Sequence, residues 1–279
     1  MNYVKTFGLM ALMTALLAGI AGYFGGGSWA VGALVFAAIF NFGSYWFSDR
    51  AVMKMYGARE IDRSEHPELY DMVDELRQRA GLPMPTVAIA DRDQPNAFAT
   101  GRNPENAVVC VTKGILPLLD RDELRGVLAH ELAHVQNRDM LIMTLAATMS
   151  AAIVTLSRFG VFFGGGRDRG GAVGAIAMMI LGPLAAMLIQ MAISRAGEFR
   201  ADRTGAEIAG DPNGLAGALE AMERAAERQP MEVNQAAAHL AIVNPLRGDL
   251  ASGLAKLFRT HPPTEERVQR LREMATPGA

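Results

Sequence analysis

Two histidines and a glutamate lie within five positions of each other, in His130-Glu131-Leu132-Ala133-His134. Residues i and i+4 share one face of an α-helix, so both imidazoles can bind one Zn²⁺ ion with Glu131 beside it. Zinc lowers the pKa of a bound water to about 7, and Glu131 is then the base that accepts the proton and passes it to a leaving amine. The spacing predicts a metal-dependent hydrolase with one zinc ion per chain, rather than two ordinary surface histidines.

A catalytic zinc ion needs a third protein ligand and one open position. We expect Glu198 to be that ligand, although a solvated helix carboxylate is the alternative. His134 lies shortly before the third of four apolar runs and Glu198 shortly after the fourth, so a membrane hairpin between them would return the carboxylate to the depth of the histidines. Asp202 follows one helical turn later and is expected either to hold a ligand imidazole or to pair with a nearby arginine.

Two further segments supply candidate substrate contacts. His261 precedes two prolines and a helix, and it is either a catalytic residue that stabilises the oxyanion or a turn histidine. The short strand that begins at Ala97 can pair with an extended peptide by strand addition, or it is part of an ordinary hairpin. Asn96, Ala97 and Phe98 are therefore candidate substrate-binding residues.

Four uncharged or nearly uncharged runs, each close to the length of a membrane-spanning helix, determine the predicted organisation of the chain. They cover residues 6–24, 29–47, 140–157 and 172–193. We interpret them as two transmembrane hairpins, with a signal peptide as the alternative for the first run and a re-entrant segment for the second hairpin. The predicted division is a first hairpin at 1–50, a protease domain in two parts at 51–137 and 194–279, and a second hairpin at 138–193.

The polar stretches that flank each hairpin emerge on the same side of the membrane and can fold together as one domain. Lys and Arg gather at the ends of the spans on that side, whereas the loop after the first span has neither. The positive-inside bias therefore favours a cytoplasmic domain. Arg158, Arg167 and Arg169, at the far end of the second hairpin, weaken this inference.

Within the polar domain, the apolar spacing predicts an α+β fold that is mostly helical. The expected helices cover residues 67–80, 120–137, 211–229 and a segment that begins at 263, and the expected strands cover 86–90, 97–100 and 108–112. Asp120 and Glu123 form a capping-box pattern at the start of the helix that contains the histidines.

The composition excludes several classes of protein. The 279-residue chain is 50% apolar with a net charge of −2, which suits a protein divided between bilayer and water and gives no support for a nucleic-acid partner. Its one cysteine, Cys110, excludes an intramolecular disulfide framework and a zinc site of several thiolates. Cys110 lies in an apolar run and is expected to fill the core.

Five motifs together resemble the protease HtpX family, which consists of membrane-bound zinc metalloproteases related to the CAAX prenyl proteases. The motifs are HELAH (130–134), SRAGEFRAD (194–202), PNAFATGRNPENAVVCVTKGIL (95–116), VNPL (243–246) and THPPTEER (260–267). The likeness extends over essentially the whole chain, and the departure from it is a glycine-rich turn at 164–171.

This resemblance implies a gluzincin-like metalloprotease domain on a four-helix transmembrane anchor. His130, His134 and Glu198 would be the zinc ligands and Glu131 the catalytic residue. The implied activity is endoproteolysis of misfolded or damaged membrane proteins, as stress-related quality control in the bacterial inner membrane. A histidine like His261 and an asparagine like Asn96 contact the bound peptide in related enzymes.

Two other functions stay open from the residues alone. The first is an intramembrane zinc protease, although charged residues such as Glu123, Arg138 and Asp139 flank the histidine motif. The second is a non-enzymatic membrane adaptor with a structural zinc ion, which would require a fourth protein ligand.

Overall fold

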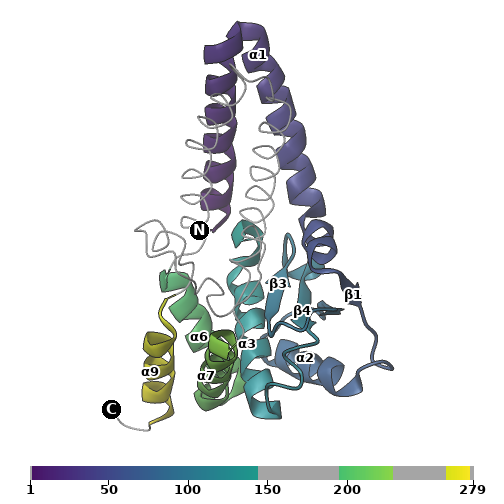
Figure 1. Cartoon of the computed structure of the whole chain (residues 1–279), viewed down its shortest axis with the longest axis vertical. Helices are drawn as coiled ribbons and strands as arrows, with labels where there is room; N and C mark the ends of the chain where they lie inside the picture. Colours follow the sequence, from purple (N-terminus) through teal and green to yellow (C-terminus); the bar gives the residue numbers. More distant parts are fainter. Residues whose placement is uncertain (1, 144–194, 229–261, 277–279) are drawn as a thin grey trace.

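The computed structural model describes residues 2–143, 195–228 and 262–276 (Figure 1). A four-stranded sheet and a group of helices form the domain, and a long helical hairpin extends from it. The elements in chain order are α1 (Asn2–Tyr56), β1 (Ala58–Glu60), α2 (Pro67–Arg79), β2 (Thr86–Ala90), β3 (Ala97–Thr100), the 3₁₀ turn η1 (Pro104–Asn106), β4 (Val108–Thr112), α3 (Arg121–Asn137), α6 (Arg195–Ala209), α7 (Pro212–Arg228) and α9 (Thr264–Ala275).

These elements confirm the prediction of a mostly helical α+β protein. Three strands begin and end at the predicted residues, and the predicted helices agree to within about two residues at each end, as is usual for helix termini. Nearly all of the second predicted hairpin lies outside the described residues, and so does His261.

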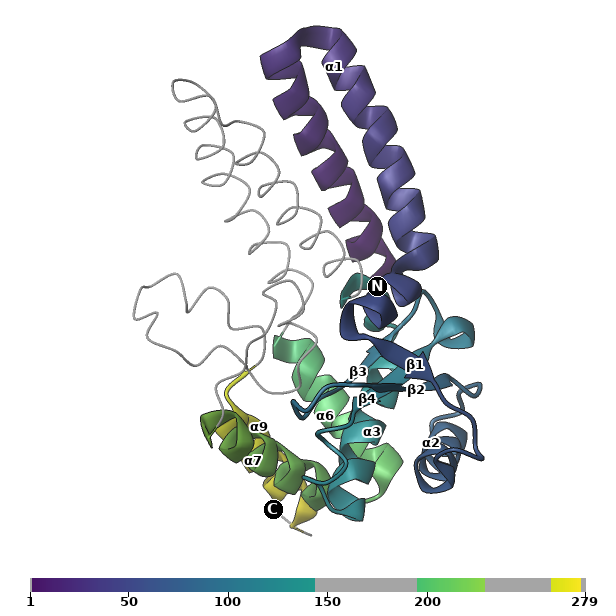
Figure 2. The same ribbon diagram turned by 45° about the vertical axis from the view of Figure 1, so that its right-hand side comes forward.

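Helix α1 is a hairpin of two arms that turns back at Gly26, where φ is 76° and ψ is −170°. Figure 2 shows the two arms side by side, and the amide of Asn41 in the second arm donates a hydrogen bond of 2.9 Å to Thr14 in the first. Among the described residues, one helical segment, Gly26–Phe47, is long and apolar enough to cross a membrane. Large apolar side chains are exposed along it, namely Trp29, Leu34, Phe36, Ile39, Phe42 and Trp46.

The sheet is mixed and has the order β1-β2-β4-β3, with β2 and β4 parallel and the outer strands antiparallel to their neighbours. Successive side chains of a strand point to opposite faces, and both faces of this sheet are buried. Val87, Ile89, Val109 and Val111 belong to the main core with α2 and α3, whereas Ala88, Ala90, Phe98 and Cys110 pack against the domain end of α1. Cys110 is fully buried, as predicted.

Strand β1 was not predicted from the sequence. Its three residues, Ala-Arg-Glu, carry no apolar alternation, and they form a strand through backbone pairing with β2. Since β1 and β3 are the outer strands, β3 keeps one edge that no other strand occupies among the described residues.

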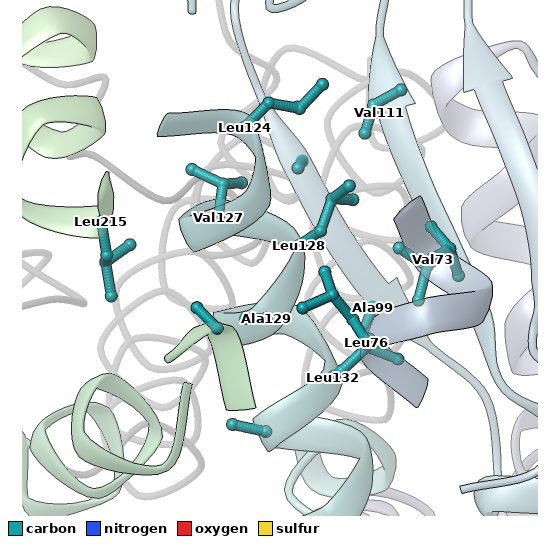
Figure 3. Close-up of a cluster of buried hydrophobic side chains, with 14 of the residues drawn as sticks. Val73, Leu76, Ala99, Val111, Leu124, Val127, Leu128, Ala129, Leu132 and Leu215 are labelled. Atoms are coloured by element: carbon teal, nitrogen blue, oxygen red, sulfur yellow. The ribbon is translucent and has the colours of Figure 1, made fainter. Parts of the chain in front are cut away.

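Helix α3 lies at the centre of the domain and holds the histidine motif. The predicted capping box is present, because the Asp120 carboxylate accepts from the backbone N–H of Glu123 and the Glu123 side chain accepts from the backbone N–H of Asp120. In Figure 3, Leu128 and Leu132 of α3 lie among apolar side chains of α2 and the sheet, with Leu215 of α7 on the other side of the helix. Burial on several sides fixes the rotation of α3 and therefore the direction of its histidines.

Helix α6 crosses α3 very closely at Gly205. A Cβ atom at this position would lie 2.8 Å from Cα of His130 and 2.9 Å from its backbone nitrogen. Both neighbours are backbone atoms of a buried helix, so they cannot move aside as a side chain would. The absence of a side chain at Gly205 lets α6 approach α3 next to the histidine motif.

We expect Gly205→Ala to destabilise the protein by about 1–3 kcal/mol, since its methyl group forces the two helices apart. Denaturant unfolding of the full chain in detergent micelles measures this change. Gly43→Ala is the matched control, because a Cβ atom added at this position in α1 would meet nothing within 4 Å. Equal stability of the two variants would contradict the proposed role of the close crossing.

Candidate metal centre

Three side chains from two helices point their ligand atoms at one another, as predicted. Nε2 of His130 lies 3.2 Å from Nε2 of His134, and the Glu198 carboxylate oxygens lie 3.5 Å from the latter and 3.9 Å from the former. Ligand atoms about 2.0–2.1 Å from a tetrahedral zinc ion are roughly 3.3 Å apart. The three side chains are buried and form the one metal-compatible cluster found in the described part of the chain.

The charges around these ligands suit a divalent cation. Glu131, Glu198 and Asp202 are buried carboxylates, and Arg267 is the buried guanidinium among them. The buried carboxylates outnumber the buried guanidinium, so a divalent cation reduces the excess of negative charge. A buried cluster of uncompensated carboxylates is otherwise costly.

The surroundings shift the pKa values of the two imidazoles in opposite directions. Burial lowers the pKa of His130. Burial also opposes protonation of His134, but the nearby carboxylates of Asp139 and Glu198 raise its pKa to about 9. The surroundings of His134 therefore favour a positive charge at this position, and a bound metal ion supplies one while leaving the ring neutral.

Asp202 makes both of the contacts that were considered for it. Its Oδ1 lies 3.0 Å from Nδ1 of His130, and the Arg267 guanidinium donates to both carboxylate oxygens, at 2.6 and 2.9 Å. Burial would raise the pKa of Asp202, but Arg267 holds it well below the usual range. A charged Asp202 fixes the orientation of the His130 ring, which leaves Nε2 directed at the metal site.

Glu131 lies beside the ligands and is also buried. Burial raises the pKa of its carboxyl to about 7, because an ionised carboxylate loses its hydration there. The backbone N–H of Ala99 in β3 donates to its Oε2 at 2.8 Å. Glu131 is therefore oriented by the outer strand of the sheet, and its pKa suits a group that accepts and releases a proton near neutral pH.

The predicted substrate residues lie at the start of β3, the strand whose Ala99 N–H binds Glu131. Asn96 is buried, its side chain is hydrogen-bonded to Tyr56 of α1, and its carbonyl accepts from the N–H of Thr112 in β4. The Phe98 ring lies 4.5 Å from the Tyr56 ring, centroid to centroid. Asn96 and Phe98 thus join β3 to the end of α1 rather than to the metal centre.

Arg267 is the main residue of the centre that the sequence analysis did not identify. It lies in α9, and it is 1% exposed although it carries a charge. Its position in the motif THPPTEER was the only available signal, because its partner Asp202 is far away along the chain.

The chain is similar to known proteases over nearly its whole length. Residues 63–275 match the family description "Peptidase family M48". A "Protease HtpX homolog" of Salinibacter ruber is 60% identical over 275 residues, which cover 99% of both chains. Another, from Gemmatimonas aurantiaca, is 55% identical over 278 residues, covering 99% of this chain and 100% of the relative.

A crystal structure of S. mikatae Ste24p has a similar fold, with a TM-score of 0.55 and 17% sequence identity. The alignment covers 97% of this chain but 65% of that protein. At this identity, the likeness concerns the fold alone.

We expect Arg267→Met to destabilise the protein by about 3–5 kcal/mol, because it leaves the buried Asp202 without its main partner. Arg272→Met on the same helix is the control, since Arg272 is about half exposed and its ion pair with Glu220 is worth about 0–1 kcal/mol. Unfolding of both variants in detergent micelles gives the comparison. If the Arg267 variant lost no more stability than the control, the buried pair would not hold the centre together.

Proposed function

The chain belongs to peptidase family M48 as a homolog of protease HtpX, and on this basis we propose that it cleaves misfolded or damaged membrane proteins at the cytoplasmic face of the bacterial inner membrane. Its membership makes it a zinc metallopeptidase, and His130, His134 and Glu198 are the zinc-binding triad typical of M48 proteases. The predicted enzyme class and cofactor are confirmed. The substrates, the multi-pass topology and the orientation in the membrane are part of our proposal.

The observation that carries the proposal is a buried three-ligand site with a carboxyl group beside it. His130, His134 and Glu198 would hold the zinc ion, which would act as a Lewis acid and lower the pKa of a water molecule. Glu131 then accepts a proton as general base and delivers it to the leaving amine as general acid. Its raised pKa of about 7 supports both roles.

The open edge of β3 is the proposed binding strand for an extended peptide. In an antiparallel pair, backbone groups of alternate residues point to the partner strand and to the outside. The Asn96 carbonyl accepts from β4, and the Ala99 N–H donates to Glu131 on the opposite side. By this alternation Ala97 offers its N–H and carbonyl at the edge and Ala99 its carbonyl, since the Ala99 N–H binds Glu131. Asn96 and Phe98 hold the strand against β4 and Tyr56.

We further propose that His261 helps to stabilise the oxyanion. It lies outside the described residues, so the proposal rests on its position six residues before Arg267 in the same motif. Arg267 lies in the centre, with Nη2 3.5 Å from Nε2 of His130. The described residues that follow His261 therefore lead to the site.

The proposed membrane anchor consists of the hairpins at 1–50 and 138–193, with the domain formed by 51–137 and 194–279. The exposed apolar side chains of Gly26–Phe47 support the first hairpin. The end of α1 is firmly attached to the domain, because Val52 is fully buried and the Arg92 guanidinium donates to the carbonyl of Tyr56. The anchor thus holds the peptide-binding strand near the bilayer surface, where substrate segments leave the membrane.

The two alternatives are less well supported. Helix α3 packs against the sheet within the domain, and the apolar hairpin of α1 extends away from that domain (Figure 1). This arrangement favours cleavage outside the bilayer. A structural zinc site would need a fourth ligand, and among the described residues the cluster contains three.

We expect Glu131→Gln to lower the rate of casein cleavage by about 10²–10⁴-fold, because the amide cannot act as general base. The zinc content should stay at one ion per chain, since the three ligands are intact. Glu207→Gln, at an exposed position on α6, is the matched control and should retain full activity. Unchanged cleavage by the Glu131 variant would refute the proposed mechanism.

We expect a cysteine at Ser64 to be shielded from a membrane-impermeant maleimide in intact spheroplasts, and a cysteine at Ser28 to be labelled. Both serines are exposed, at the domain and at the turn of α1 respectively, and the native Cys110 is buried. Lysis of the cells should make Ser64→Cys reactive. The reverse pattern would place the domain outside the cytoplasm.

A further inference from the structure

Helix α3 ends three residues after the histidine motif in a turn that is unusual for its sequence. Arg138 adopts the left-handed conformation, with φ 58° and ψ 35°. Among the described residues, it is the one residue other than glycine that has a positive φ. This conformation normally favours Gly or Asn. The turn has both hydrogen bonds of a Schellman motif, from the N–H of Arg138 to the carbonyl of Val135 and from the N–H of Asp139 to the carbonyl of His134.

The turn folds the next residue back over the helix end. Asp139 is buried, and its Oδ2 lies 3.6 Å from Nδ1 of His134. On the other side, Nη2 of Arg200 donates to both oxygens of Asp139, at 3.1 and 3.2 Å. Arg200 lies in α6, two residues after the third zinc ligand.

We propose that Asp139 is a positioning residue for His134 and that Arg200 holds Asp139 in place. The arrangement resembles the one around the other ligand, where Asp202 lies 3.0 Å from Nδ1 of His130 and Arg267 binds Asp202; the corresponding distance from Asp139 is longer, at 3.6 Å. Each imidazole thus has one carboxylate at Nδ1, and each carboxylate has one arginine. A carboxylate at Nδ1 fixes the tautomer that leaves Nε2 free for the metal.

A purely structural role for Asp139 makes a different prediction. Asp139 also lies at the start of the next helical turn, where its carbonyl accepts from the N–H of Met143, so its side chain could serve only as a helix cap. Asn caps helices about as well as Asp but carries no negative charge for the imidazole. Asp139→Asn therefore preserves the capping role and removes the positioning role.

The experiment measures metal binding by the full-length apo protein in detergent micelles. Zinc affinity is obtained by competition with a chromophoric chelator, and the absorption spectrum of the Co²⁺ form reports the ligand geometry. We expect Asp139→Asn to weaken zinc binding by about 10–100-fold and to change the Co²⁺ spectrum, with the melting temperature of the apo protein unchanged. Asp71→Asn, which alters an exposed ion pair with Arg63, should resemble the native protein in all three measurements.

Native zinc affinity and a native Co²⁺ spectrum in Asp139→Asn would overturn the proposal. If this variant does not fold, Arg200→Gln decides the question, because it leaves Asp139 in place and alters a half-exposed partner. This variant should weaken zinc binding by a smaller factor, and unchanged binding would count against the proposal. The inference rests on the zinc site of the proposed function, but it is tested without substrate, so its failure would be distinct from a failure of the proposed proteolysis.

Discussion

The chemistry of this protein depends on bringing two imidazole nitrogens and one carboxylate oxygen within 4.8 Å of each other from separate helices. The backbones of α3 and α6 must nearly touch for this, and Gly205 makes the approach possible. The packing of the rest of the domain keeps α3 in the orientation that this close approach needs. The sheet, α2 and α7 bury the remaining sides of α3, so that the helix has one orientation and its histidines one direction.

Burying so many charged groups is tolerable only because nearly all of them are paired. Unpaired buried charges are expensive, and the penalty is reduced when each group finds a partner of opposite charge with good geometry. Here arginines from α6 and α9 contact carboxylates that in turn face the imidazoles. The same contacts join segments that are distant in the sequence, so the stability of the domain and the geometry of the centre have a common origin.

The sequence predicted what depends on local spacing and failed where the determinants are distant. The histidine pair, its capping box and three strands were recognisable because their signals fall within a few residues. Glu198 was found by reasoning about a membrane hairpin rather than from local pattern. Arg267 was missed, since burial of an arginine depends on a carboxylate in another helix, and β1 was missed because backbone pairing alone makes it a strand.

The order of the centre's parts along the chain has a consequence for biosynthesis. The imidazole pair is translated first, Glu198 follows only after the fourth apolar run, and Arg267 comes later still. A nascent chain that ends before Glu198 has two nitrogen ligands and no carboxylate to complete the metal site. Until Glu198 has been synthesised, the chain therefore lacks the carboxylate that completes the metal site, and the contact of Arg267 with Asp202 can form only later.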